Sequence, residues 1–470
     1  MSQNRFTRNL SANTVQLFIN QFFGLVIFYA LSKGLNKDLF GQVNWSLAVL
    51  LTVFGVLSFG IDQVMVKKIA AGYNRQAVFT AYLLHVLISG GIFYGLLFLG
   101  YLFFHASLPQ LALLFIIGTG KIFIFLSSPF KQLVTGLEKF RALLFMSVGS
   151  NIIRGAALLV LLIVKSISIN KVLFIFITGD LLELLCCIIV AGPLLKKPFI
   201  NTRSKRIQYL LLKESLPQAG VVVFTAIMSR FDWILVGILV SSSKLAEYSF
   251  AWKAFEVATL PLLIIAPLMI PLFTRLFRLP GPIAGLSFFL EWQIIIASFI
   301  ALLLNLCWVP VADFITDGKY GAVNGPTILL LSLSMPLLYV NNYLWTINFA
   351  RGKLKRIFLI MAVAFVVNIA ACSILIPLYK NEGAAFAFFC TLLVQLMLYL
   401  QHTGFPSPAA RRHFLLVWPL AALLCGTFAK QYLGNTTLSL VIAAALYALL
   451  VFCSGQVRQK DWKTLQSLYQ

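Results

Sequence analysis

The sequence has very little charge and, in particular, very little negative charge. Only 11% of its 470 residues are charged, and Asp and Glu together number 14, whereas 60% of the residues are hydrophobic. Roughly a quarter of the residues of a soluble domain are charged, so a chain of this composition could not cover a surface that faces water. The composition therefore indicates a membrane protein whose surface is covered by lipid.

Histidine and cysteine are also scarce, and neither is arranged as a set of metal ligands. The four histidines are scattered, and the seven cysteines all lie within apolar runs. We expect no metal, no cofactor and no disulfide, and we interpret the cysteines as small apolar side chains. We find no nucleophile with a neighbouring base, so the sequence does not indicate an enzyme. The first apolar run lacks a small-residue cleavage site and is expected to be a retained helix.

The net charge of +23 does not indicate a nucleic-acid-binding protein. Most Lys and Arg residues lie in short segments between apolar runs, where the positive-inside rule places them. The sequence has no basic domain and no RNA-binding or DNA-binding module. We therefore expect membrane lipids, and no nucleic acid, among the partners.

Long apolar runs recur from one end of the sequence to the other. Each is long enough for a helix to cross a hydrocarbon core of about 30 Å, and runs such as 156–164 and 441–453 do not alternate as barrel strands would. We predict an all-α polytopic membrane protein with fourteen transmembrane helices. The predicted spans are 13–35, 41–66, 79–104, 111–134, 141–164, 171–195, 214–240, 245–273, 287–311, 326–349, 356–378, 382–401, 414–431 and 437–454.

The basic residues between the spans give the orientation. If the N-terminus is cytoplasmic, about three quarters of the Lys and Arg residues in the connecting segments and span edges lie on the cytoplasmic side. One missed or invented span would reverse every later segment and destroy this bias. Both termini are therefore predicted to be cytoplasmic, and we expect a multi-pass protein of a bacterial inner membrane.

Several charged residues lie within the predicted spans. A charge at the centre of a bilayer costs at least roughly 2.5–3.5 kcal/mol, so such side chains are expected to face a protein interior or a wet cavity. Asp62 lies near the cytoplasmic end of the second span. The deep bases are Lys121, Arg154, Arg230 and Lys253, and the deep acids are Asp180, Glu183, Asp232 and Glu256.

Helical spacing predicts some of the pairings. Asp180 and Glu183 are three residues apart and share one helix face, and Lys253 can pair with Glu256 at the same spacing. Arg154 shares a face with Asn151. Two interpretations remain open at this point: buried ion pairs that orient the helices, or a hydrated cavity for a charged substrate or a coupling ion.

Polar stripes and prolines mark two further spans. The first span has Asn13 and Asn20 on one face, and the tenth has Asn341 and Asn348; both stripes fit either a wet interior or hydrogen bonds between helices. The eighth span contains prolines, each of which removes a backbone hydrogen bond and is expected to kink the helix or form a hinge. These prolines are Pro261, Pro267 and Pro271.

Short similar segments indicate an internal repeat. The segment 40–46, which opens the second span, is similar to 245–251, which opens the eighth. The segment 136–151, which leads into the fifth span, is similar to 352–368, which leads into the eleventh. We predict two pseudo-symmetric six-helix lobes followed by two appended helices. The predicted boundaries are 1–200 for the N-terminal lobe, 201–403 for the C-terminal lobe, and 404–470 for the last two helices and a cytoplasmic tail.

At these positions the sequence resembles a known family, the polysaccharide transporters, or Wzx-type O-antigen flippases, of the multidrug/oligosaccharidyl-lipid/polysaccharide (MOP) exporter superfamily, which includes the MATE transporters. The similar segments lie in the same order relative to the spans and cover about 8–385. They are Arg8-Asn9, Leu39-Phe40-Gly41-Gln42, Gly60-Ile61-Asp62, Lys213-Glu214-Ser215-Leu216-Pro217, Ser229-Arg230-Phe231-Asp232, Glu247-Tyr248, Arg351-Gly352-Lys353, Asn368, Ile376-Pro377 and Glu382-Gly383-Ala384-Ala385.

The resemblance implies a function that is not an enzymatic one. Members flip an undecaprenyl-diphosphate-linked oligosaccharide to the periplasmic leaflet by alternating access, and H⁺ or Na⁺ drives many of them. Among the deep charges, Arg230 and Asp232 match the family pattern. The resemblance also implies a role in the synthesis of O-antigen lipopolysaccharide, capsule or exopolysaccharide, and a polysaccharide polymerase as a partner. The first span lacks the deep arginine of some lipid-diphosphate flippases.

From depth and charge we assign candidate roles. The cavity candidates are Asn13, Asn20, Asn151, Asn341 and Asn348. The anionic headgroup is expected to bind Arg230, Arg154, Lys121 and Lys253, and coupling or ion pairing is expected of Asp180, Glu183, Asp232 and Glu256. Three other functions remain open: a lipid II flippase, a multidrug or cation antiporter of the MATE type, and a membrane-embedded glycan polymerase. A polymerase would need large external loops, which the sequence lacks.

Overall fold

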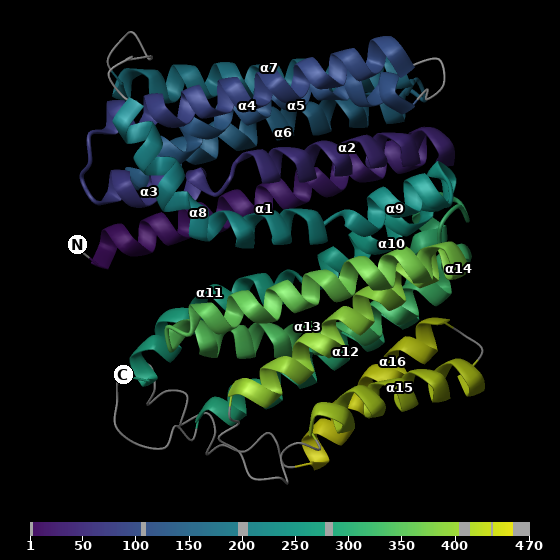
Figure 1. Ribbon diagram of the computed structural model, residues 1–470. Coiled ribbons are helices and arrows are strands. Elements are labelled where there is room, and N and C mark those ends of the chain that lie inside the picture. Colours follow the sequence, from purple (N-terminus) through teal and green to yellow (C-terminus); the bar gives the residue numbers. More distant parts are fainter. Residues whose placement is uncertain are drawn as a thin grey trace. The chain divides into compact units, whose positions relative to one another are not determined.

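The computed structural model describes residues 3–104, 110–195, 205–277, 285–403, 414–433 and 436–454. Regular structure in these residues is entirely helical (Figure 1). The helices are α1 (Gln3–Gly34), α2 (Lys37–Leu57), α3 (Ile61–Ala70), α4 (Arg75–Phe104), α5 (Gln110–Gly136), α6 (Phe140–Ile163), α7 (Ile169–Ala191), α8 (Lys205–Met228), α9 (Phe231–Leu239), α10 (Ser242–Ala258), α11 (Leu260–Leu276), α12 (Gly285–Thr316), α13 (Gly325–Ala350), α14 (Leu354–Thr403), α15 (Phe414–Leu433) and α16 (Thr436–Cys453), with short 3₁₀ turns at Gly192–Leu194 and Ala322–Asn324.

The helical order confirms the predicted fold class. Among the described residues, eight helices are long and apolar enough to cross a membrane unaided, and α15 and α16 are shorter apolar helices. The fourteen predicted spans correspond in order to α1, α2 with α3, α4 to α7, α8 with α9, α10 with α11, α12, α13, the two halves of α14, α15 and α16. Large apolar side chains on their outer faces, such as Phe314 at 84% exposed, face what would be lipid.

Several predicted spans are two helices in the structure. The second span breaks between α2 and α3, where Phe59 and Gly60 have positive φ angles of 53° and 70°. The eighth span divides at Thr259, two residues before Pro261, which is the second residue of α11. The span is therefore interrupted beside this proline, and the predicted kink or hinge stays a prediction. Pro267 and Pro271 lie within α11, and their side chains fall outside the described residues.

The break after α2 leaves no unsatisfied carbonyl in the last turn of that helix. The backbone N–H groups of Ser58 and Phe59 and the Ser58 hydroxyl bond to the carbonyls of 54–56. The fourth carbonyl, that of Leu57, lies 2.8 Å from Nε2 of His85 on α4. The last carbonyls of a helix have no partner within the helix. His85 supplies the hydrogen bond that the Leu57 carbonyl would otherwise lack.

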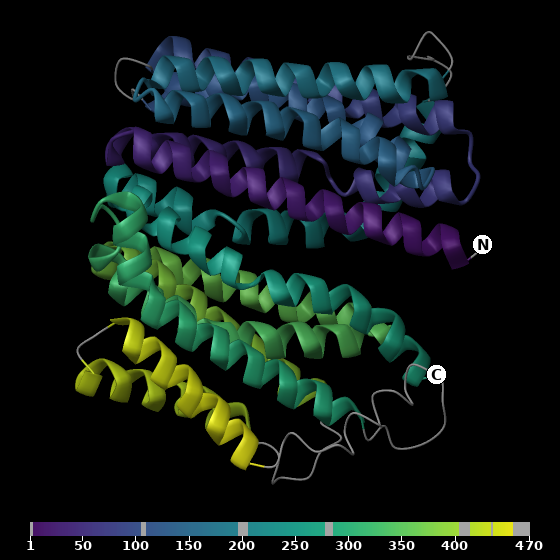
Figure 2. The same ribbon diagram turned by 180° about the vertical axis from the view of Figure 1, so that it is seen from behind.

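The chain forms two compact units, Met1–Ala246 and Glu247–Gln470. In the first unit α5 packs against α2, α4 and α7, α1 packs on α6, and α8 packs on α2 and α4. In the second unit α13 lies between α12 and α14, and α15 and α16 pack on α12. Within each unit the long helices run alongside one another in both views (Figures 1 and 2). The predicted lobe boundaries stay a prediction.

The two units have separate apolar cores. The core of the first unit lies among α3, α4, α5 and α7 and includes Phe79, Tyr82 and Leu133. The core of the second unit joins α11, α12, α13, α14, α15 and α16 around residues such as Phe273 and Tyr447. The appended helices α15 and α16 therefore share one core with the helices before them.

Candidate functional site

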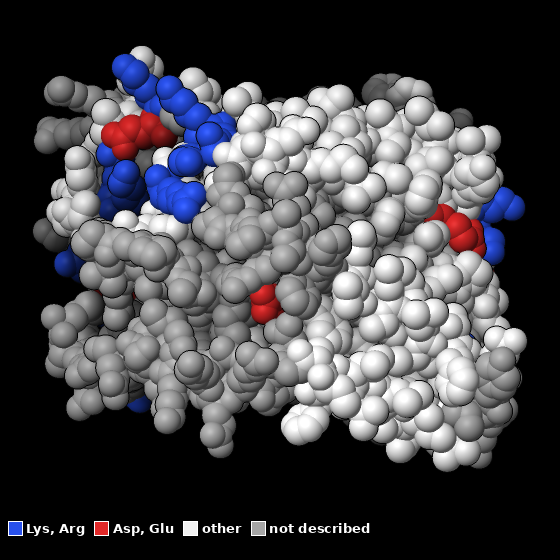
Figure 3. Space-filling model, turned by 90° about the horizontal axis from the view of Figure 1, so that it is seen from below, with Lys and Arg blue, Asp and Glu red and all other residues white. Residues whose placement is uncertain are grey.

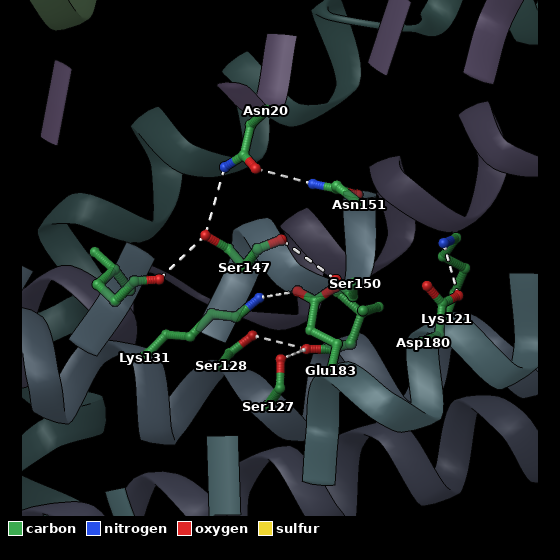
Figure 4. Close-up of polar contacts among 12 residues, drawn as sticks. Asn20, Lys121, Ser127, Ser128, Lys131, Ser147, Ser150, Asn151, Asp180 and Glu183 are labelled. Atoms are coloured by element: carbon green, nitrogen blue, oxygen red, sulfur yellow. Dashed lines mark hydrogen bonds and ion pairs between the residues drawn. The ribbon is translucent and has the colours of Figure 1, made fainter. Parts of the chain in front are cut away.

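The first unit contains a cluster of charged side chains from three adjacent helices, here called the charge cluster: Lys121 and Lys131 on α5, Arg154 on α6, and Asp180 and Glu183 on α7. Nζ of Lys121 lies 2.7 Å from Oδ2 of Asp180. Arg154 pairs with Asp180 through Nη1 and with Glu183 through Nη2, the latter at 2.7 Å. Lys131 pairs with Glu183. Figure 4 shows Lys121 reaching Asp180 and Lys131 pointing toward the Glu183 side of the cluster.

The centre of the charge cluster is buried, its two lysines are half-buried, and its formal charges sum to one positive charge in excess. Asp180 is fully buried, and Arg154 and Glu183 are 7% and 4% exposed. Two carboxylates face three cations in these contacts. A buried ion pair recovers its desolvation cost only when the geometry and the additional hydrogen bonds are good. The cluster meets that condition because each carboxylate contacts two cations.

Arg154 also forms hydrogen bonds to neutral groups. Its Nη2 lies 3.0 Å from the hydroxyl of Ser150, and its Nε donates to the Ser150 carbonyl at 3.3 Å. The Ser150 hydroxyl in turn lies 2.6 Å from Oε2 of Glu183. The guanidinium is therefore held on three sides, and its orientation is fixed by α6 and α7 together.

Two glycines make room for the charge cluster. A Cβ atom at Gly120 would lie 2.8 Å from Oδ2 of Asp180, and one at Gly179 would lie 2.6 Å from Cδ of Arg154. Real Cβ atoms do not approach so closely. The absence of a side chain at these two positions thus lets α5, α6 and α7 bring the charged groups into contact.

The polar residues of α1 join the same region. Nδ2 of Asn151 donates to Oδ1 of Asn20 at 3.0 Å, and Asn20 lies 3.5 Å from the hydroxyl of Ser147. These bonds connect α1 to α6 beside the charge cluster (Figure 4). Asn13 lies in α1, and its side chain falls outside the described residues.

The other deep charges lie apart from the charge cluster in the chain. Arg230 is the N-cap residue of α9, and its guanidinium lies 4.4 Å from the centre of the Trp233 ring. The carboxylate of Asp232 accepts from the backbone N–H of Trp233 at 2.9 Å. Lys253 pairs with Glu256 at 2.8 Å, which confirms the predicted pair. The structure places Lys253 and Glu256 in the second unit and the charge cluster in the first.

The asparagines of α13 form hydrogen bonds to α14. Nδ2 of Asn341 donates to the Leu392 carbonyl at 2.8 Å, and Asn348 donates to the Thr403 hydroxyl at 2.9 Å. Bonds between helices were one of the two predicted explanations for this stripe. A cavity-lining role for these residues stays a prediction.

Sequence reasoning missed two members of the site. Lys131 lies near the cytoplasmic end of the predicted span 111–134 and counts among the span-edge residues of the sequence, not among the deep bases. In the structure α5 continues to Gly136, and Lys131 pairs with the buried Glu183. Ser150 carries no sequence signal of its own. Its position four residues before Arg154, on the same helix face, is the feature that could have identified it. The described residues contain no group of three or more His, Cys, Asp or Glu side chains that could hold a metal ion.

Comparison with protein families decides the affiliation of the chain. Residues 6–277, more than half of the chain, match the family described as polysaccharide biosynthesis protein. The chain belongs to this polysaccharide biosynthesis family. The matched range contains the whole charge cluster and both members of the Arg230–Asp232 pattern. A search of curated proteins by sequence finds no match.

Solved structures show the fold of this family member. It is similar to "Lipid II flippase MurJ, inward closed conformation", with a TM-score of 0.75 and 15% identity over 95% of this chain and 99% of that chain. It is also similar to an inward-facing multidrug resistance MATE transporter of the MOP superfamily, with a TM-score of 0.64 and 12% identity over 90% and 99% of the two chains. A Vibrio cholerae MATE transporter matches with a TM-score of 0.55 and 12% identity over 85% and 98%.

These comparisons confirm the resemblance on which the sequence analysis relied. The chain is a multi-pass membrane protein with the fold of MOP-superfamily flippases and transporters. The solved structures with this fold are a flippase and multidrug transporters. The identities are too low to carry over any substrate, which is therefore argued from the site.

Proposed function

We propose that this protein flips an undecaprenyl-diphosphate-linked oligosaccharide from the cytoplasmic to the periplasmic leaflet of a bacterial inner membrane, for the synthesis of a cell-surface polysaccharide. The observation that carries the proposal is the buried charge cluster with its excess of cations. The affiliation to a polysaccharide biosynthesis family supports the oligosaccharide part of the substrate.

A diphosphate needs cations that are shielded from lipid. Arg154, Lys121 and Lys131 offer three of them, each held in place by a carboxylate. Arg154 is the best placed, because a planar guanidinium binds phosphate oxygens with two parallel hydrogen bonds. Arg230 and Lys253 are further candidates for the headgroup, while the polyprenyl tail stays in the bilayer.

The same contacts offer a means of coupling. In the ion-paired arrangement, Asp180 and Glu183 occupy the cations that a diphosphate would use. If one carboxylate takes up a proton or a sodium ion, its cation is released and becomes available to the diphosphate. Loss of that proton or ion returns the cation to the carboxylate and favours release. Asp232 and Glu256 are alternative coupling groups.

Alternating access requires a change in how helices of the bundle are arranged. The divided spans, and in particular the division beside Pro261, supply places where the backbone can bend without breaking a regular helix. We propose this division as the hinge. A polysaccharide polymerase is the proposed downstream partner, since the flipped oligosaccharide is its substrate class.

A lipid II flippase is the second candidate, favoured by the fold similarity at a TM-score of 0.75. Lipid II carries the same type of lipid diphosphate, so the charge cluster alone does not separate the two substrates. A MATE-type antiporter of cationic compounds is disfavoured by the excess of cations in the cluster. A deletion strain separates the first two: cytoplasmic accumulation of a lipid-linked oligosaccharide supports our proposal, and accumulation of lipid II contradicts it.

Flipping by the purified protein tests the site directly. Reconstituted vesicles containing a fluorescent undecaprenyl-diphosphate oligosaccharide would report the fraction that reaches the opposite leaflet. We expect Arg154→Gln to reduce the rate at least tenfold, whereas Lys430→Gln, which removes an exposed lysine of the second unit, leaves it unchanged. Full activity in both Arg154→Gln and Arg230→Gln would show that the headgroup assignment is wrong.

A further inference from the structure

The connection between α13 and α14 concentrates positive charge in six residues. Arg351, Lys353, Lys355 and Arg356 lie there, and Arg351 and Lys355 are exposed to solvent while the other two are half-buried. We call these four residues the basic loop. In Figure 3, described Lys and Arg side chains gather at one end of the face, with an acidic side chain among them, and the rest of the described surface in this view carries few charges.

Both arginines of the basic loop are held in place by uncharged partners. Arg351 donates to the Thr403 carbonyl at 3.4 Å, and its guanidinium lies 4.5 Å from the centre of the Phe277 ring. Arg356 donates to the His402 carbonyl. These bonds satisfy carbonyls at the end of α14 and fix both guanidinium groups, but they do not neutralise their charge.

No carboxylate balances the basic loop within the part of the chain that the structure describes. None of its four side chains forms an ion pair with a described Asp or Glu, in contrast to the cations of the charge cluster. Desolvation and the positive charges of Arg356 and Arg351 lower the pKa of the Lys353 ammonium group. The loop thus holds mutually repelling charges that an anion would relieve.

Apolar side chains beside the basic loop face outward. Leu354 is 58% exposed although it lies between Lys353 and Lys355, and Leu359, on the next turn of α14, is 63% exposed. A surface that combines fixed cations with exposed leucines at the end of a membrane helix suits the boundary between headgroups and acyl chains. A phosphate in water would contact the cations alone.

We propose that the basic loop binds the phosphate of an anionic phospholipid in the cytoplasmic leaflet, with Lys353 and Lys355 contacting the phosphate and Leu354 the acyl chains. Clusters of four or more Lys and Arg directly beside a membrane helix have the charge density that anionic lipid headgroups recognise. The leaflet rests on the orientation predicted from the distribution of basic residues, in which both termini are cytoplasmic. The binding itself does not depend on which substrate is flipped.

The lysines provide the test because their removal leaves the arginine–carbonyl bonds intact. Native mass spectrometry of the full-length protein in detergent would measure the affinity for phosphatidylglycerol and for phosphatidylcholine with the same acyl chains. Each lysine near a headgroup contributes about fivefold, so Lys353→Gln with Lys355→Gln is expected to weaken phosphatidylglycerol binding about 30-fold. Lys353→Arg with Lys355→Arg is expected to retain binding.

A control variant and a phosphate competition define the result. Lys430→Gln removes an exposed lysine of the same unit and is expected to leave binding unchanged. Equal affinity for the two phospholipids, or an unchanged affinity of the double glutamine variant, would overturn the proposal. Displacement of the lipid by an equal concentration of inorganic phosphate would also overturn it, because the site would then recognise phosphate alone.

Discussion

Gly179 on α7 lies directly against the side chain of Arg154 on α6, so that a Cβ atom at position 179 would lie 2.6 Å from Cδ of the arginine. Alanine at this position must therefore displace Arg154 from Asp180 and Glu183. An alanine in a helix interior is normally about 1 kcal/mol more favourable than glycine. We expect Gly179→Ala to lower the melting temperature and to reduce flipping. Helix propensity alone would predict a higher melting temperature.

Gly149 provides the matched control for this substitution. It lies in α6, the helix that carries Arg154, and apart from its own helix backbone nothing lies within 4 Å of the position that its Cβ would occupy. Gly149→Ala is expected to leave flipping unchanged and the melting temperature equal or higher. An equal loss in both variants would mean that the close approach to Arg154 has no special importance.

Asp180 holds two cations at once, and its removal is predicted to be costly. Asp180→Asn leaves Lys121 and Arg154 without their shared carboxylate in a buried site, for which we expect a destabilisation of about 3–5 kcal/mol. Adding Lys121→Gln removes one of the two unbalanced charges and should restore part of that loss. Thermal unfolding of both single variants and the double variant measures this coupling energy; strict additivity would contradict the shared pairing.

The sequence could predict the charged residues at the centre of this site, but not the lysine at its edge. The spacing of Asp180 and Glu183 placed both carboxylates on one face, and both contact Arg154 in the structure. Lys131 was not predicted to belong to the site, because a lysine near the end of an apolar run is typical of a loop residue under the positive-inside rule. Whether such a lysine turns to water or to a buried acid depends on tertiary contacts, which a single span does not reveal.

The order of the apolar helices could be predicted from the sequence, whereas the helix breaks could not. Hydropathy over about 20 residues is insensitive to an interruption of three residues, so α2 and α3 appear as one span in the sequence. The break near Gly60 is tolerated because His85, 28 residues away, supplies a hydrogen bond to Leu57. A contact at that separation follows from the packing of α4, not from local pattern.

The bond from His85 to the Leu57 carbonyl gives a prediction about stability. His85→Leu would leave a carbonyl at the α2 break without a partner, at a cost of about 1–3 kcal/mol. His85→Gln keeps an N–H donor of similar reach and is expected to retain most of that stability. Thermal unfolding in one detergent compares the two variants. Equal destabilisation by both would show that ring packing, rather than the hydrogen bond, is what the site requires.

The pair of Lys253 and Glu256 is expected to matter less than the charge cluster. Its side chains are 18% and 30% exposed, and pairs with access to water contribute about 0–1 kcal/mol. We expect Glu256→Gln to change the melting temperature little and to leave the dependence of flipping on H⁺ and Na⁺ gradients intact. Glu183→Gln should weaken that dependence. The reverse pattern would move the coupling role from the first unit to the second.

The predicted orientation can be tested on either side of α13. This helix has 26 residues, which at about 1.5 Å per residue is long enough to cross a hydrocarbon core of about 30 Å. Lys319 precedes it and Lys353 follows it, so cysteines at these two positions should lie on opposite sides of the membrane. In a variant without the seven native cysteines, we expect a membrane-impermeant thiol reagent to label Lys319→Cys in intact cells whose outer membrane is permeabilised. Lys353→Cys should react only in inverted vesicles.

Two outcomes would contradict the predicted orientation. Labelling of both positions from one side would mean that α13 does not cross the membrane. Labelling with the two sides exchanged would mean that the basic loop is not cytoplasmic.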